Sequence, residues 1–382
     1  MTKPGDFVLS NAKLVLADRV AEGWLAVANG LIVDYGEGSY VGTSSDVEGD
    51  FLLPGLVELH TDHLEAHAVP RPKVHWDTRA AVLAYDAQIV ASGITTVFDS
   101  LRAGELSEND GVSHVLHELA DAIGELSALG VLRAEHLTHL RCEIATPNVV
   151  QEVHTYAERR PVQLISLMDH TPGQRQFRDL EKMRTYYQRH GLSSDADFAS
   201  FVEERLAMHE RYARVNRRAL VELAQRHSVA LASHDDATLE QVEEAIADRV
   251  SIAEFPTTIE AARASHAAEI KVMMGAPNLV RGGSHSGNVA AEDLARDGTL
   301  EILSSDYVPG SLLMAAFDLP RRVAHISLPR AVAMVSRNPA RAAGLADRGE
   351  IACGRRADVV RVALHGPTPC VRQAWRAGRQ VF

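Results

Sequence analysis

The stretch Leu53-Pro54-Gly55-Leu56-Val57-Glu58-Leu59-His60-Thr61-Asp62 is a short apolar strand that ends in polar side chains. Alternate residues of an extended strand point the same way, so His60 and Asp62 can reach one point. Apolar segments of the same kind recur along the chain, with helical patterns between them, for example over 78–92, 108–129 and 239–247. The strand-like segments are 56–59, 94–99, 137–143, 162–169, 229–233, 251–255, 270–274 and 301–305. Eight such strands alternating with helices predict an α/β chain with a TIM-type (β/α)8 barrel.

Both ends of the chain have a different pattern. Short strands separated by glycine and asparagine turns are predicted over 7–9, 13–16, 24–27 and 31–35, and again over 357–362, 371–375 and 379–382. Neither end is long enough to bury a core alone, so we expect one small β-sandwich built from both. The expected division is 1–52 plus 346–382 for the sandwich and 53–345 for the barrel, with a helical hairpin inserted over 179–226.

Charge and composition exclude several classes of protein. The 382 residues hold 39 Lys plus Arg against 51 Asp plus Glu, a net charge of −12 that argues against a nucleic-acid or anionic-membrane partner. Only 3 cysteines are present, widely spaced, which argues against a disulfide framework. No leader pattern and no long apolar run is evident, so we expect a cytoplasmic protein. The oligomeric state stays open, a homo-oligomer included.

His, Asp and Glu side chains stand where the predicted strands stop. In a barrel these strand ends meet at one mouth, where active sites occur. One His-x-Asp pair arises easily by chance, and a lone buried histidine is usually a hydrogen-bonded core residue. Five strands with the same pattern favour a site for one or two divalent ions. The expected ligands are His60, Asp62, Glu143, His170, His234 and Asp306, with Glu143 able to bridge two ions; His139 is left open.

A glycine-rich stretch follows the seventh strand. Glycines at 275–288 would let backbone N–H groups approach an anion, and Arg281, Ser284, His285 and Asn288 add further donors. Residues 171–178, with Arg175, have similar chemistry after the fourth strand. Loops after the seventh and eighth strands often bind phosphate in barrels, although a loop without any ligand is the alternative.

Two motifs resemble those of the amidohydrolase superfamily: residues 53–62 as its first metal motif, and Gly349-Glu350-Ile351 through Asp358 as its C-terminal signature. Within that superfamily the chain is similar to the diphosphatases that act on α-D-ribose 1-methylphosphonate 5-triphosphate. The matching segments are 58–62, 91–97, 139–143, 166–177, 232–238, 253–258, 274–288 and 304–307, so the resemblance spans nearly the whole chain. One position departs from the subfamily pattern, because His63 stands where asparagine is typical.

The resemblance implies hydrolysis of that triphosphate to the 5-phosphate and pyrophosphate in phosphonate breakdown by the carbon–phosphorus lyase pathway. It also implies one or two divalent ions, zinc before manganese, iron or magnesium. Asp306 would take a proton from the attacking water, and Arg175, Arg281, Ser284, His285 and Asn288 would hold the phosphate chain. The alternatives are hydrolysis of a C–N bond, as in deacetylases, deaminases or cyclic amidases, and a barrel that binds a metal or nucleotide without turnover.

Overall fold

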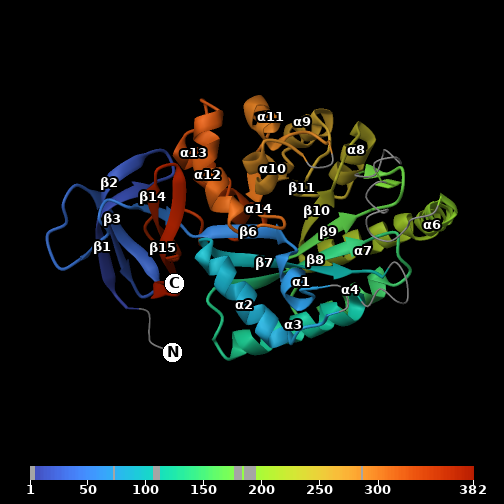
Figure 1. Ribbon diagram of the computed structural model, residues 1–382, viewed down its shortest axis with the longest axis horizontal. Helices are drawn as coiled ribbons and strands as arrows, with labels where there is room; N and C mark the ends of the chain where they lie inside the picture. The colour runs from blue at the N-terminus through green and yellow to red at the C-terminus, as the bar shows by residue number, and fades with distance from the viewer. Residues whose placement is uncertain (1–4, 72–73, 106–111, 176–182, 185–194, 285–286) are drawn as a thin grey trace.

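The computed structural model describes residues 5–71, 74–105, 112–175, 183–184, 195–284 and 287–382. Figure 1 shows a barrel surrounded by helices, with a separate sheet at one side. The barrel strands are β6 (Leu56–Thr61), β7 (Ile94–Ala103), β8 (Glu135–Glu143), β9 (Leu164–Met168), β10 (Ala230–His234), β11 (Ile252–Glu254), β12 (Lys271–Gly275) and β13 (Ile302–Ser304). They pair in parallel in chain order, and the Asp306 N–H donates to the His60 carbonyl at 3.1 Å to join the two ends. The predicted eight-stranded barrel is confirmed.

Helices cover the outside of the barrel. The longer ones are α2 (Thr78–Ala91), α3 (Val112–Ala128), α4 (Val149–Ala157), α6 (Asp195–Met208), α7 (Arg214–His227), α8 (Leu239–Ala247), α9 (Ile259–Ala267) and α12 (Ser311–Arg322). The short ones are α1 (His63–Ala68), α10 (Ala276–Arg281), α11 (Ala291–Asp297), α13 (Leu328–Ala333) and α14 (Arg337–Ala342). Among the described residues, no helix is both long enough and apolar enough to cross a membrane.

The long segment between β9 and β10 is described only in part. A π-helical turn at His209–Ala213 joins α6 to α7, so residues 195–227 form one helical run. A helical hairpin over 179–226 would need a partner helix within 179–194, most of which lies outside the described residues. Only one arm of the predicted hairpin is therefore described.

The strands at the two ends of the chain share one sheet, as predicted. Its strands are β1 (Phe7–Val15), β2 (Val20–Ala28), β3 (Leu31–Glu37), β4 (Ser45–Asp46), β5 (Phe51–Pro54), β14 (Val359–His365), β15 (Thr368–Arg376) and β16 (Arg379–Gln380). The antiparallel pair of β5 with β14 joins the two ends, and Leu14, Leu25, Leu52 and Trp375 lie in its apolar core. We retain the division 1–52 plus 346–382 and 53–345 as a proposal; β5 runs across the boundary at 52.

Two glycines of the motifs stand where a side chain would not fit. A Cβ on Gly55 would lie 2.2 Å from the Thr95 hydroxyl, at the point where the chain enters the barrel. Gly349 has φ +88° and a Cβ there would lie 2.8 Å from the Arg337 Cα. Any side chain at either position would force neighbouring atoms apart, so close packing against Thr95 of β7 and Arg337 of α14 explains the two glycines.

A buried ion cluster joins α2 to the barrel wall. His136 on β8 lies between two carboxylates, with Nδ1 2.9 Å from Asp99 Oδ2 and Nε2 3.3 Å from Asp86 Oδ1. Burial alone would lower the pKa of His136, but the Asp99 and Asp86 carboxylates override it and raise the pKa to about 9. His136 is therefore charged in the folded protein at neutral pH.

This cluster predicts an alkaline loss of stability. Because the pKa of His136 is higher in the folded state than in the unfolded state, its protonation stabilises the fold. This contribution is complete when the pH is below the ordinary pKa of histidine, and it disappears as the pH rises through about 9. We expect His136→Gln to lower the free energy of unfolding by about 3 kcal/mol at pH 7, and by much less at pH 10. Urea unfolding of both proteins at both pH values measures this. An equal deficit at the two pH values would contradict a charged His136.

Candidate active site

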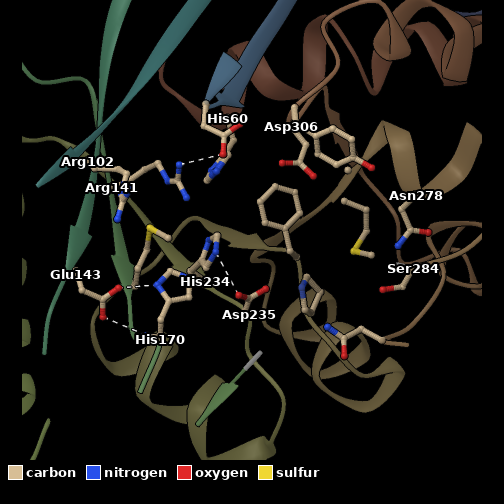
Figure 2. Close-up of a pocket in the computed structure, with 18 of the residues that line it drawn as sticks. His60, Arg102, Arg141, Glu143, His170, His234, Asp235, Asn278, Ser284 and Asp306 are labelled. Atoms are coloured by element: carbon tan, nitrogen blue, oxygen red, sulfur yellow. Dashed lines mark hydrogen bonds and ion pairs between the residues drawn. The ribbon is translucent and has the colours of Figure 1, made fainter. Parts of the chain in front are cut away.

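A cavity of about 550 Å³ opens at the C-terminal ends of the barrel strands (Figure 2). Its size suits a small-molecule ligand. The six side chains predicted as metal ligands all line it, as do two of the predicted phosphate-binding residues: His60, Asp62, Glu143, His170, His234, Asp306, Ser284 and Asn288. The barrel mouth therefore collects residues from strands that are far apart in the sequence.

One group of possible ligand atoms lies at the ends of β9 and β10. His170, His234 and Asp235 each offer an atom within 4.8 Å of the others. A carboxylate engages Nδ1 of each ring: Glu143 Oε2 lies 2.6 Å from that of His170, and Glu254 Oε2 lies 3.0 Å from that of His234. Such carboxylates orient imidazole ligands in metal sites and fix their tautomer.

The second ring nitrogen of His234, Nε2, lies next to the carboxylate of Asp235. His234 Nε2 lies 3.3 Å from Asp235 Oδ2, a buried oxygen that accepts no hydrogen bond from the residues described. Burying a carboxylate oxygen in this way is costly unless a cation balances it. These residues therefore fit a divalent metal.

Glu143, the predicted bridge between two ions, contacts a neighbouring histidine in this structure. Both of its oxygens are directed to His170, because Oε1 accepts the backbone N–H at 3.1 Å and Oε2 contacts Nδ1. The reason is register: Glu143 pairs with Met168 on the adjacent strand, so its side chain reaches the residue two positions beyond. In this structure Glu143 orients His170.

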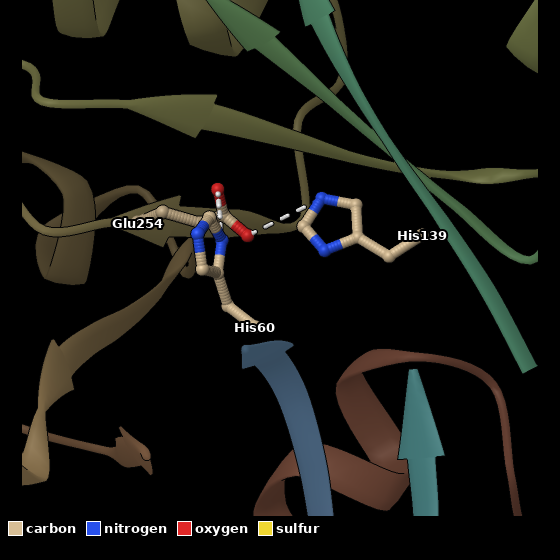
Figure 3. Close-up of side chains that lie close together, drawn as sticks. All are labelled: His60, His139 and Glu254. Carbon is tan, nitrogen blue, oxygen red and sulfur yellow. Dashed lines mark ion pairs between the residues drawn. The ribbon is translucent and has the colours of Figure 1, made fainter. Parts of the chain in front are cut away.

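A second group, deeper in the barrel, contains His60, His139 and Glu254 (Figure 3). His139 has both ring nitrogens engaged: Nδ1 lies 2.8 Å from the Leu59 carbonyl and Nε2 lies 2.9 Å from the Ser166 hydroxyl. His60 Nδ1 and Glu254 Oε1 are buried without a hydrogen bond within the described part of the chain. A cation would satisfy these two atoms, whereas His139 is already satisfied by the protein.

The sequence places Glu254 and Asp235 at strand ends but assigned neither of them a role, and it left His139 open. Glu254 ends β11, and its carboxylate lies between two histidines of other strands, 3.3 Å from His60 Nδ1 and 3.0 Å from His234 Nδ1. In the sequence, Glu254 could have been recognised only as a single acidic residue at the end of a short apolar strand. Asp235 could have been recognised because it directly follows His234, a predicted metal ligand.

Burial sets the protonation of the site. It lowers the pKa of His60 and His234 to about 3, so both rings are neutral at pH 7, the form that binds metal. It raises the pKa of Asp235 to about 7, and burial together with the Asp62 charge raises that of Asp306 to about 7. Carboxylates with raised pKa values are stabilised in their charged form by a nearby cation.

Backbone strain is concentrated at the same place. Asp235, Phe255 and Asp306 have φ values of 56°, 54° and 53°, a region that side chains other than glycine seldom adopt. Asp235 and Phe255 directly follow barrel strands, Asp306 lies two residues after the end of β13, and all three line the cavity. Clusters of such residues are typical of functional sites, where surrounding contacts hold the strain. The Phe255 ring packs edge-on against His60 at a centroid distance of 5.0 Å.

The predicted phosphate loops are arranged differently from the expectation. Residues 276–281 form helix α10 rather than a loop, since Pro277 suits the first turn of a helix. Arg281 ends that helix with an exposed side chain and does not line the cavity. Arg175 is buried behind the site, where it donates to the His234 carbonyl at 2.9 Å and pairs with Asp236. His285 lies outside the described residues.

Two other arginines line the cavity instead. Arg102 on β7 and Arg141 on β8 are register partners on adjacent parallel strands, so their side chains emerge together (Figure 2). Arg141 Nη1 lies 3.4 Å from Asp62 Oδ2. Among the described cavity-lining residues these two are the permanently charged cations. The sequence predicted no role for either arginine, because register between strands is not visible in the sequence.

The barrel with its terminal sheet, and the histidine and carboxylate side chains at its mouth that could hold a metal, are features of a metal-dependent hydrolase. Residues 51–381 match the amidohydrolase family, and the chain belongs to that family. The chain is 46% identical over 98% of its length, and over 100% of the relative, to the alpha-D-ribose 1-methylphosphonate 5-triphosphate diphosphatase of Escherichia coli (strain K12).

Solved structures of other specificities share the fold. A 5-methylcytosine deaminase from Klebsiella pneumoniae, liganded with 5-fluorocytosine, has a TM-score of 0.66 at 16% identity and covers 98% of this chain and 97% of its own. An N-acetyl-D-glucosamine-6-phosphate deacetylase mutant from Mycobacterium smegmatis has a TM-score of 0.64 at 17% identity, covering 99% of both chains. At these identities the likeness supports the fold alone.

The two ligand groups predict different effects on metal content. We expect His170→Ala to lower the divalent metal bound per chain by about one equivalent, since it removes one of three converging ligands. His139→Gln should retain the wild-type content, because both nitrogens of that ring are engaged by the protein. Elemental analysis of purified, folded variants measures both. Equal metal loss in the two variants would contradict this distinction.

Proposed function

We propose that this chain hydrolyses α-D-ribose 1-methylphosphonate 5-triphosphate to the 5-phosphate and pyrophosphate during phosphonate breakdown. The observation that carries the proposal is the 46% identity, across 98% of this chain and 100% of the relative, to a diphosphatase of that specificity. The substrate is a small molecule, and a cavity of about 550 Å³ can accommodate one of this class.

The proposed metal site uses the residues expected from the sequence together with those added by the structure. His170, His234 and Asp235 would hold one cation, with Glu143 and Glu254 orienting the two rings. His60, Asp62 and Asp306 line the same cavity and would complete one or two ion sites. Imidazole and carboxylate ligands suit zinc, with manganese, iron or magnesium as alternatives. When bound, a divalent cation makes water nucleophilic near neutral pH.

Asp306 is the proposed base. Its carboxylate lies in the cavity on the same side as His60 (Figure 2), where a carboxylate can take a proton from a water molecule held at the site. Gly275 makes room for it, since a Cβ there would lie 3.3 Å from Asp306 Oδ2. Asp306 would accept the proton of the water that attacks the α-phosphorus.

Arg102 and Arg141 are the proposed partners of the phosphate chain, in preference to Arg175 and Arg281. When pyrophosphate leaves, negative charge builds up on its oxygens. One guanidinium group can donate two parallel hydrogen bonds to the oxygens of a phosphate. Both arginines lie on one side of the cavity, and Ser284 lies across it (Figure 2). The substrate would lie between these walls, with its triphosphate toward the arginines.

Product analysis tests the proposal. Purified, metal-loaded protein is incubated with α-D-ribose 1-methylphosphonate 5-triphosphate, and pyrophosphate, orthophosphate and ammonia are measured. One pyrophosphate per substrate consumed is expected, together with the 5-phosphate. Orthophosphate as the first product would contradict cleavage at the α-phosphorus. Ammonia from nucleobase substrates, without pyrophosphate release, would favour C–N hydrolysis instead.

A further inference from the structure

Helix α1 carries two histidines four residues apart on the side that faces α2. Nε2 of His63 and Nε2 of His67 each lie 3.0 Å from the same atom, the side-chain oxygen Oε1 of Gln88 on α2. The two rings are nearly perpendicular, at 84°, with centroids 5.2 Å apart. Three atoms that can bind a metal therefore converge on one point.

This point is separate from the catalytic cavity. None of His63, His67 and Gln88 lines the cavity, and none belongs to the two ligand groups described above. Both histidines are half-buried and Gln88 is exposed, so the site lies at the surface between the two helices and is open to water. Water molecules can therefore fill the remaining positions around an ion.

We propose that His63, His67 and Gln88 bind an additional divalent ion outside the catalytic cavity, a transition metal such as Cu²⁺, Ni²⁺ or Zn²⁺. Histidines at i and i+4 lie on one face of a helix, so one ion can contact both rings. Neutral imidazole is a common ligand for these metals. Without an ion, the Nε2–H groups of both rings donate to Gln88 Oε1, which already directs both rings toward one point. When an ion binds, the proton of each neutral ring is carried by Nδ1 instead, and little conformational freedom is lost.

Such an ion would link the cavity wall to the outer layer of the barrel. Asp62 immediately precedes α1, and Glu65 lies on it; both line the cavity. Gln88 belongs to α2, which packs against α1 (Figure 1). Metal binding at His63 and His67 is therefore expected to slow hydrogen exchange of the α1 amides, a readout independent of catalysis.

The test uses Cu²⁺ as the probe, on full-length protein whose catalytic site is already loaded with metal. Electron paramagnetic resonance and equilibrium titration should detect one additional equivalent with two imidazole nitrogens. His67→Ala should weaken that binding by about tenfold or more, because the chelate becomes a single ring. His154→Ala, which removes an exposed histidine from α4, is the matched control and should not change it.

Three results would overturn the proposal: no additional equivalent in the wild type, equal affinity in His67→Ala, or Cu²⁺ uptake only with release of the catalytic metal. If His67→Ala fails to fold, Gln88→Leu replaces it, because this change removes only the shared oxygen. Binding to Gln88→Leu that is weaker than to the wild type, with both imidazole nitrogens retained, supports the site. Unchanged affinity excludes Gln88 as a ligand and overturns the three-ligand site.

Discussion

Asp306→Asn is expected to lower kcat by about 10²- to 10⁴-fold, the usual contribution of a general acid or base. The amide keeps the shape of the carboxylate but cannot take the proton of the attacking water. The folded state should persist, because Asp306 joins β13 to β6 through its backbone N–H rather than its side chain. Initial rates of pyrophosphate release at saturating substrate measure the effect.

The metal content of Asp306→Asn distinguishes a lost base from a lost ligand. We expect most of the metal to remain, since His170, His234 and Asp235 form a ligand group without Asp306. Asp293→Asn, an exposed carboxylate on α11, is the matched control and should leave kcat unchanged. A near-normal rate in Asp306→Asn would remove this residue as the base.

Arg102→Ala is expected to lower kcat/KM for the triphosphate substrate by about 10²- to 10³-fold, the effect typical of removing one donor to a developing anion. The side chain lines the cavity, where low exposure to water strengthens its interaction with phosphate. Arg102 is a cleaner test than Arg141, because Arg141 also contacts Asp62 and its removal would disturb a predicted metal ligand.

Arg281→Ala provides the matched comparison, with the same change of residue at the exposed end of α10. Steady-state kinetics of both variants with triphosphate and monophosphate ribosides measure the difference. The structure leads us to expect an effect of less than about threefold for Arg281→Ala, as for most surface substitutions. A larger loss of kcat/KM in Arg281→Ala than in Arg102→Ala would indicate that the glycine-rich stretch 275–288 binds the phosphate chain.

Much of the fold follows from patterns that are local in the sequence. Each barrel strand is an apolar run of a few residues bounded by turns, and all eight were predicted within a few residues of their bounds. Helix α8 was predicted with both ends correct, because Thr238 caps its first turn and the apolar spacing is regular. The strands at both ends of the chain were also recognised from their turns.

The sequence could also place polar residues at the strand ends, because parallel strands of a barrel present those ends on one side. That rule predicted the cavity positions of His60, His170, His234 and Asp306. It could not decide what each side chain contacts. Arginine commonly binds phosphate, yet the guanidinium group of Arg175 lies behind the site and pairs with Asp236.

The sequence by itself therefore determined the barrel, the shared terminal sheet and the chemical character of the mouth. Tertiary structure alone decided the partners of each group. Arg102 and Arg141 meet because β7 and β8 pair in one register, and Glu254 contacts His60 and His234 because three strands converge. The physical reason is range: the periodicity of a strand is set by neighbouring residues, whereas register and side-chain contacts depend on residues far apart in the chain.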